Sequence, residues 1–122
     1  MRAMLLSAGY GLRFRPLTES LPKPAIPVLG RPMLVQNLAR LARHGFDRVV
    51  VNVHHRPEVI EHLVAEAGAS ALPGVTISRE EQLLGTAGGL RRAASWLRGN
   101  GPILIHNGDF LSDIALEGVL EA

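Results

Sequence analysis

The sequence has no cysteine, few aromatic residues and no long hydrophobic run, and each of these features limits what the protein can be. Without cysteine, neither disulfides nor thiolate metal sites can form. No stretch approaches the roughly 18–20 apolar residues that a membrane-spanning helix needs, and the N-terminal apolar run is too short for a signal peptide. We therefore expect a cytoplasmic protein without a membrane partner. Because only 4% of the residues are aromatic, the core must consist of Leu, Val, Ile and Ala.

Charge is nearly balanced, with a formal net charge of +2. No run of basic residues is interleaved with aromatic ones, so we expect no nucleic-acid partner. Lysine is almost absent, because Lys23 is the only one and the other residues in the Lys+Arg count are arginines. Pro22 and Pro24 flank Lys23 and restrict its backbone. The place of this single lysine on a rigid segment needs an explanation.

Hydrophobic periodicity along the 122 residues predicts strands that alternate with helices in one domain. Short apolar or β-branched runs predict strands at residues 3–7, 47–53, 74–78 and 102–107. Helical spacing of apolar residues predicts helices at residues 32–45, 57–68 and 86–99, with a short helix starting near Asp113 and a long loop over 9–31. This alternation predicts an α/β protein with a Rossmann-like, three-layer α/β/α fold and a mainly parallel sheet. Ligands of such sheets bind beyond the carboxyl ends of the strands.

Gly9 and Gly11 follow the first predicted strand directly. Glycine lets the backbone turn sharply, approach a ligand closely and direct amide groups at a phosphate. Two familiar phosphate-binding motifs are nevertheless excluded. The third glycine of a dinucleotide-binding fingerprint would fall at Phe14, and a Walker A loop needs a Gly-Lys pair that the sequence lacks.

The longer string GYGLRFRPLTESLPKPAIPVLGRPML (9–34) is much more specific. It resembles the signature of sugar-1-phosphate nucleotidylyltransferases, G-x-G-T-R-(L/M)-R-P-L-T, a short spacer, P-K-P and G-(K/R)-P-(M/L). The motifs LLGTAGGL (83–90) and HNGDFLSD (106–113) match the same family in order and spacing, so the resemblance covers essentially the whole chain. It looks closest to the bacterial uridylyl- and guanylyltransferases that act on N-acetylmuramate 1-phosphate and mannose 1-phosphate. The sequence departs from the pattern at Leu12, where threonine is usual, at Ser7 (alanine) and at Leu83 (proline).

The resemblance implies a Mg²⁺-dependent transfer of a nucleotidyl group from an NTP, with UTP or GTP favoured, to a sugar 1-phosphate. The sugar phosphate attacks the α-phosphorus in line with the departing pyrophosphate. Lys23 and Arg13 are the implied catalytic residues, because such chemistry needs positioning and positive charge at the phosphates. The alternatives are a solvated loop residue for Lys23 and a surface salt bridge for Arg13. Arg15 either contacts the phosphates or only covers the loop.

The acidic motif after the fourth predicted strand is the implied metal site. Asp109 is the matching family residue, and a carboxylate there suits Mg²⁺, which binds few carboxylates together with substrate phosphates. The alternative is an ordinary turn aspartate. Asn107 either contacts the sugar phosphate or holds the loop, and Asp113 is expected to cap the following helix.

The resemblance assigns nucleotide binding to two segments. The residues from both segments are Leu6, Ala8, Gly9, Gly11, Leu12, Arg13, Lys23, Gln82, Gly85 and Thr86. For Thr86 a simple helix N-cap is the alternative. The five histidines do not predict a zinc site, because the adjacent His54 and His55 would point to opposite sides of a strand end.

Members of the family continue well beyond this length, with strands that build the sugar pocket and commonly a second acidic metal ligand. We therefore expect residues 1–122 to be the N-terminal, nucleotide-binding part of a single nucleotidyltransferase domain. Two alternatives to an active enzyme remain open. One is a nucleotide-binding regulatory module without turnover. The other is an inactive fragment that packs against a partner supplying the rest of the sheet, which predicts an exposed apolar sheet edge and self-association of the isolated chain.

Overall fold

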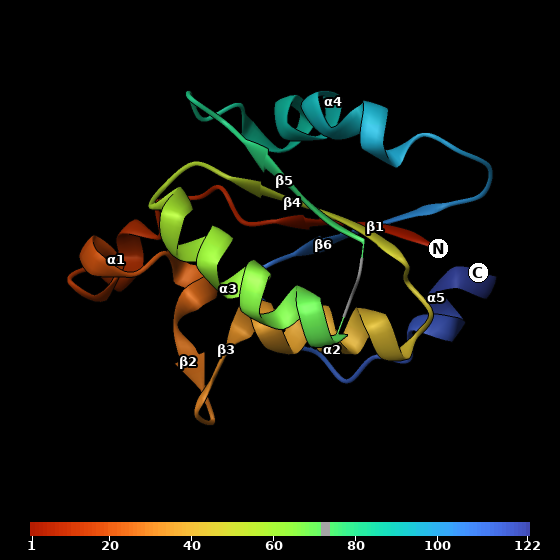
Figure 1. Cartoon of the computed structure of the whole chain (residues 1–122), viewed down its shortest axis with the longest axis horizontal. Helices are drawn as coiled ribbons and strands as arrows, with labels where there is room; N and C mark the ends of the chain where they lie inside the picture. Colours follow the sequence, from red (N-terminus) through yellow and green to blue (C-terminus); the bar gives the residue numbers. More distant parts are fainter. Residues whose placement is uncertain (72–73) are drawn as a thin grey trace.

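A parallel sheet between two helical layers forms the body of the protein in the computed structural model (Figure 1). The structure describes residues 1–71 and 74–122, and within them the sheet has four strands. Their spatial order is β5 (Val75–Arg79), β4 (Arg48–Val53), β1 (Arg2–Leu6) and β6 (Ile103–Asn107). Helices α2 (Met33–Arg43) and α3 (Pro57–Ala71) cover one face, and α4 (Gly85–Leu97) covers the other. The predicted three-layer α/β/α fold with a parallel sheet is confirmed.

The two central strands are buried on both faces, which explains their nearly continuous apolar sequences. In β1, Ala3 and Leu5 pack into the larger core beneath α2 and α3, whereas Met4 points to α4. In β4, Val50 likewise packs with Met4, while its neighbours face the larger core. This period of two follows from the pleat of a strand.

Arg2 ties α4 to the start of β1. It is a buried arginine, and its guanidinium donates hydrogen bonds to the backbone carbonyls of Leu97, Asn100 and Gly101. The last carbonyls of a helix have no partner within the helix, so this side chain satisfies groups that would otherwise be left without one. Arg2 thereby joins α4 to the sheet at the end of β1 opposite to Gly9 and Gly11.

The predicted elements are confirmed to within a few residues, with two corrections. The helix predicted near Asp113 begins later, as α5 (Leu116–Glu121), and its N-cap is Ala115, so Asp113 does not cap it. Contacts with the core and with the residue that follows α2 accompany the observed position of α5. Its Leu116 is buried in the core, and the imidazole of His44 pairs with the carboxylate of Glu117.

Residues 9–31, predicted as a long loop, contain several short elements. In chain order these are η1 (Leu12–Phe14), α1 (Leu17–Ser20), η2 (Lys23–Ala25), β2 (Pro27–Val28) and β3 (Arg31–Pro32). Buried side chains hold the segment to the body, among them Thr18, Pro24 and Ala25. These short elements depend on local turns and long-range contacts, so they leave no regular hydrophobic period in the sequence. Periodicity alone therefore could not predict them.

Strand β6 lies at one edge of the sheet and carries exposed apolar side chains. Ile103 and Ile105 are 39% and 45% exposed, and they line an apolar surface hollow together with Leu90, Ala94 and Leu97 of α4. The exposed apolar edge expected for a self-associating fragment is therefore present. Among the described helices, none has both the length and the apolar character to cross a membrane.

Candidate active site

The carboxyl ends of the strands bring the sequence motifs to one edge of the sheet. Register pairs Leu6 of β1 with Asn52 of β4 on one side and with Asn107 of β6 on the other. Here we call residues 7–14 the glycine loop and residues 80–86 the second loop. The glycine loop, the second loop and the turn after β6 all leave the sheet at this edge. The predicted site residues other than Gln82 therefore converge, as expected for a parallel sheet.

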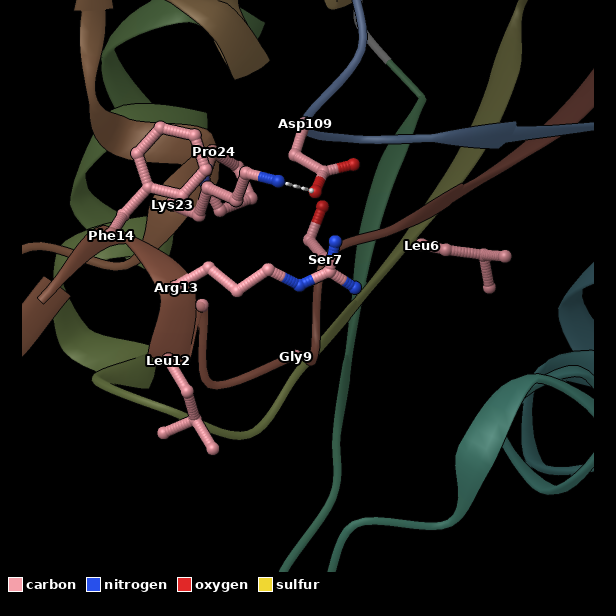
Figure 2. Close-up of a pocket in the computed structure, with 10 residues that line it drawn as sticks. Leu6, Ser7, Gly9, Leu12, Arg13, Phe14, Lys23, Pro24 and Asp109 are labelled. Carbon is pink, nitrogen blue, oxygen red and sulfur yellow. Dashed lines mark ion pairs between the residues drawn. The ribbon is translucent and has the colours of Figure 1, made fainter.

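A first cavity of about 400 Å³ lies between the glycine loop and the turn after β6. It is lined by Leu6, Ser7, Gly9, Gly11, Leu12, Arg13, Phe14, Lys23, Pro24 and Asp109 (Figure 2). Lys23 Nζ lies 2.7 Å from Asp109 Oδ2 and 4.7 Å from the centre of the Phe14 ring. The side chain of Arg13 enters the same cavity. Two cationic side chains and one carboxylate thus line the same cavity.

The conformation of Gly11 places Lys23. Gly11 has a left-handed backbone, with φ of 64°, and a Cβ at this position would lie 2.9 Å from Thr18 Cγ2 and 3.2 Å from Lys23 Cβ. The hydroxyl of Thr18 donates to the Gly11 carbonyl at 2.8 Å, and the imidazole of His55 donates to the Thr18 carbonyl at 2.8 Å. Only glycine fits this left-handed backbone position so close to Thr18 and Lys23. The backbone at Gly11 therefore packs against Lys23 and helps to fix its position.

Asn37 of α2 holds the turn that carries Asp109. Its buried side-chain amide donates to the carbonyls of Gly108 and Phe110, at 3.2 and 3.0 Å. The amide of Gly108 donates in turn to the carbonyl of Leu6 at 2.8 Å. The carboxylate of Asp109, 34% exposed, therefore projects into the cavity from a turn that is fixed on both sides.

A second cavity of about 340 Å³ adjoins the first and shares Leu6, Gly9 and Asp109 with it. Its other lining residues are Ala8, Asn52, Leu83, Gly85, Thr86 and Asn107. Helix α4 starts at Gly85 with Leu84 as its N-cap, so Thr86 lies in the first turn and is not the cap. Gln82 is exposed and lies outside both cavities.

A network of polar residues next to the site was not predicted from the sequence, where His54 was considered only as a zinc ligand. Asn52 and Glu80 are buried and hydrogen-bonded to each other. His54 donates from Nδ1 to the carbonyl of Glu80, and its Nε2 accepts from the hydroxyl of Tyr10 at 2.7 Å. A signal for Asn52 existed, because it is the polar interruption of the apolar run VVVNV.

No cluster of three or more His, Asp or Glu side chains able to hold a metal ion occurs within residues 1–71 and 74–122. A metal ion at this edge would therefore need ligands from bound phosphates and water in addition to Asp109. Asn107 offers an amide oxygen in the same cavity. One carboxylate, one amide oxygen and open space match the preferences of Mg²⁺ better than those of zinc.

Together, the fold and the site define an α/β protein with a cavity at the carboxyl edge of a parallel sheet that is lined by the cationic side chains of Arg13 and Lys23. The family model for nucleotidyl transferase matches residues 2–122. The chain belongs to the nucleotidyl transferase family, as the sequence motifs indicated.

Relatives agree with this family, and a solved structure agrees with the fold. The chain is 38% identical over 122 residues to mannose-1-phosphate guanyltransferase from Pichia angusta, covering 99% of this chain and 34% of the relative. It is 40% identical over 117 residues to N-acetylmuramate alpha-1-phosphate uridylyltransferase from Neisseria meningitidis serogroup B, covering 93% and 49%. The fold matches the crystal structure of HddC from Yersinia pseudotuberculosis complexed with GMP-PN, with a TM-score of 0.85, 22% identity and coverage of 98% and 52%. The chain thus spans a third to about half of the relatives it matches.

Proposed function

We propose that the protein serves the transfer of a nucleotidyl group from an NTP to a sugar 1-phosphate, which yields a nucleotide sugar and pyrophosphate. The observation that carries the proposal is the first cavity, where Lys23 and Arg13 of one segment meet Asp109 of another. Relatives named for guanylyl and uridylyl transfer to sugar 1-phosphates support it. We expect the triphosphate to occupy this cavity.

The chemistry follows from the charges. A phosphate oxygen of the sugar 1-phosphate forms a bond to the α-phosphorus, and the bond from that phosphorus to the bridging oxygen breaks. Pyrophosphate leaves with the electron pair of that bond. Negative charge grows on the leaving group, and Arg13 and Lys23 are placed to stabilise it in a hollow that fixed loops have already shaped. Arginine suits forked contacts to phosphate oxygens, whereas lysine supplies a compact point charge.

Mg²⁺ fits the donor set at Asp109, with Asn107 as a further oxygen ligand beside it. When bound, Mg²⁺ would neutralise charge on the phosphates and orient them. Lys23 contacts only Oδ2 of Asp109. A Mg²⁺ ion held at this carboxylate would therefore weaken its pairing with Lys23 through charge repulsion, which would favour contact of the ammonium with a phosphate.

The second cavity is where we place the nucleoside. It opens from the first across Leu6 and Gly9, and it is lined by the second loop at Gly85 and Thr86. Backbone groups of Ala8 and Gly9 border it from the opposite side. UTP and GTP are the favoured substrates, in keeping with the names of the uridylyl- and guanylyltransferase relatives.

We further propose that residues 1–122 form the nucleotide-binding part of a larger domain. The coverage of the relatives, 34% and 49% of their lengths, supports this view, and so does the apolar edge at Ile103 and Ile105. It leads to a second candidate function, nucleotide binding without turnover by this chain alone. Self-association through β6 would then bury the edge.

A pyrophosphate-release assay tests the transfer. The chain is incubated with Mg²⁺ and UTP or GTP, together with mannose 1-phosphate or N-acetylmuramate 1-phosphate. We expect release that depends on the sugar phosphate and is lost in Lys23→Ala, while Arg92→Ala, an exposed arginine on α4, behaves like the parent. Nucleotide binding without release would favour the second candidate.

A further inference from the structure

A buried amide–carboxylate pair lies beneath the second cavity and has no part in the chemistry above. Asn52 is 3% exposed and Glu80 is 2% exposed. Asn52 Nδ2 donates to Glu80 Oε1 at 2.8 Å. A buried carboxylate is costly unless donors surround it, so the position of this glutamate requires the hydrogen bonds it makes.

Each member of the pair also holds one of the two loops. Asn52 Oδ1 accepts the backbone N–H of Ser7 at 2.8 Å, at the start of the glycine loop. Glu80 Oε2 accepts the backbone N–H of Leu84 at 3.1 Å, at the end of the second loop. The chain of bonds from Ser7 through Asn52 and Glu80 to Leu84 therefore links the glycine loop to the second loop, and Asn52 itself lines the second cavity. We call this chain the strut.

The strut works in only one arrangement of donors and acceptors. If the Asn52 amide were turned over, its NH₂ would face the N–H of Ser7 and its oxygen would face the carboxylate. Both contacts would become repulsive. The Ser7 N–H thus fixes the orientation of Asn52, and this orientation requires an acceptor from Glu80.

Helix α4 packs directly on the strut at Gly89. A Cβ there would lie 2.7 Å from Glu80 Oε1 and 2.9 Å from Asn52 Nδ2. The helix can approach only because this residue has no side chain. The N-terminal end of α4 lies close to the carboxylate, and the helix dipole favours a negative charge at that end.

We propose that Asn52 and Glu80 are positioning residues that set the separation of the glycine loop and the second loop for a nucleoside. The proposal rests on the proposed function, since it assigns these loops to an NTP. If the pair served folding alone, loss of the strut would lower stability without changing nucleotide affinity. Under the proposal, loss of the strut changes nucleotide affinity in a chain that is still folded.

A charge exchange between the two positions provides the decisive variant. In Glu80→Gln, one N–H donor faces another whichever way the amides turn. In Asn52→Asp, two carboxylates meet. In the double variant Asn52→Asp/Glu80→Gln, every hydrogen bond is restored. The carboxylate at position 52 accepts from the Ser7 N–H and from the side-chain NH₂ at position 80. The side-chain oxygen at position 80 accepts from the Leu84 N–H. Ser78→Ala is the matched control, because Ser78 pairs in register with Asn52 and its buried hydroxyl has no hydrogen-bond partner among the described residues.

The experiment combines calorimetric titration of UTP and GTP with hydrogen exchange of the Ser7 and Leu84 amides, at a temperature where every variant is folded. We expect each single variant to weaken binding by about tenfold or more, and the double variant to recover most of it. Glu80→Gln should also speed exchange at Ser7, a residue that Glu80 does not touch. Ser78→Ala should leave the affinity and both exchange rates unchanged.

Two results would overturn the proposal. One is unchanged nucleotide affinity in both single variants, which would make the pair purely structural. The other is a double variant as weak as the singles. If the parent chain binds no nucleotide, the proposed function fails independently of the strut. Hydrogen exchange of the Ser7 amide in Glu80→Gln then decides whether the strut couples the two loops.

Discussion

The ammonium of Lys23 lies 2.7 Å from the carboxylate of Asp109, so the proposed phosphate-binding cation and the proposed metal ligand hold each other in the free site. Both side chains are partly exposed, at 27% and 34%, and such pairs contribute roughly 0–1 kcal/mol. The pair is therefore weak enough for a bound substrate to separate.

Removal of the lysine should free the carboxylate for a cation. We expect Lys23→Met to bind Mn²⁺, used as a probe for Mg²⁺, up to about fivefold more tightly than the parent in the absence of nucleotide. Electron paramagnetic resonance titration of free Mn²⁺ measures this. Arg15→Met, an exposed arginine on the same segment, is the control and should not change the affinity. Weaker Mn²⁺ binding in Lys23→Met would refute the competition.

Arg13 should distinguish triphosphates from monophosphates. Its side chain lines the first cavity, where we place the phosphates beyond the first. We expect Arg13→Ala to weaken NTP binding about tenfold and to leave NMP binding nearly unchanged, because charged hydrogen bonds to phosphate are lost only for the NTP. Calorimetric titration of both ligands provides the comparison. An equal loss for both nucleotides would place Arg13 elsewhere.

The tight turn at Gly11 should make it sensitive to a single methyl group. Gly11→Ala would combine a left-handed backbone with a 2.9 Å contact to Thr18, and we expect a loss of roughly 1–3 kcal/mol in the free energy of unfolding. Gly9→Ala is the stability control, because no atom lies within 4 Å of its added Cβ. Urea unfolding measures both variants, and equal stabilities would contradict the packing described.

The apolar edge at β6 should promote association of the isolated chain. We expect Ile105→Lys to lower the self-associated fraction at high protein concentration, because a charge on an edge strand opposes pairing with another chain. Light scattering after size-exclusion chromatography measures the mass. Val119→Lys, on exposed α5, is the control and should behave like the parent. A parent that is monomeric throughout would exclude this route.

Much of the fold could be predicted because its signals are local. Strands β1 and β4 read as apolar runs, proline marks the start of helices α2 and α3, and a glycine follows the end of α2. Parallel topology then brought Gly9, Lys23 and Asp109 to one edge. The family motifs supplied their roles, which composition and spacing alone left open.

The remaining features depend on contacts between distant residues. Helix α5 starts at Leu116 because α2 and the core hold it there, although Asp113 looked like a cap. Glu80 read as one acidic residue among others in a loop, and only the fold shows it buried against Asn52. No period or short motif records such a pair.

The most direct test of the central claim is calorimetric titration of the chain with UTP, GTP, dTTP, CTP and ATP, each with Mg²⁺ and with excess chelator. The account predicts selective binding of UTP or GTP, strengthened by Mg²⁺ and lost in Lys23→Ala. A folded chain that binds none of the five, or a Lys23→Ala variant that binds like the parent, would contradict a nucleotide site at Lys23 and Asp109.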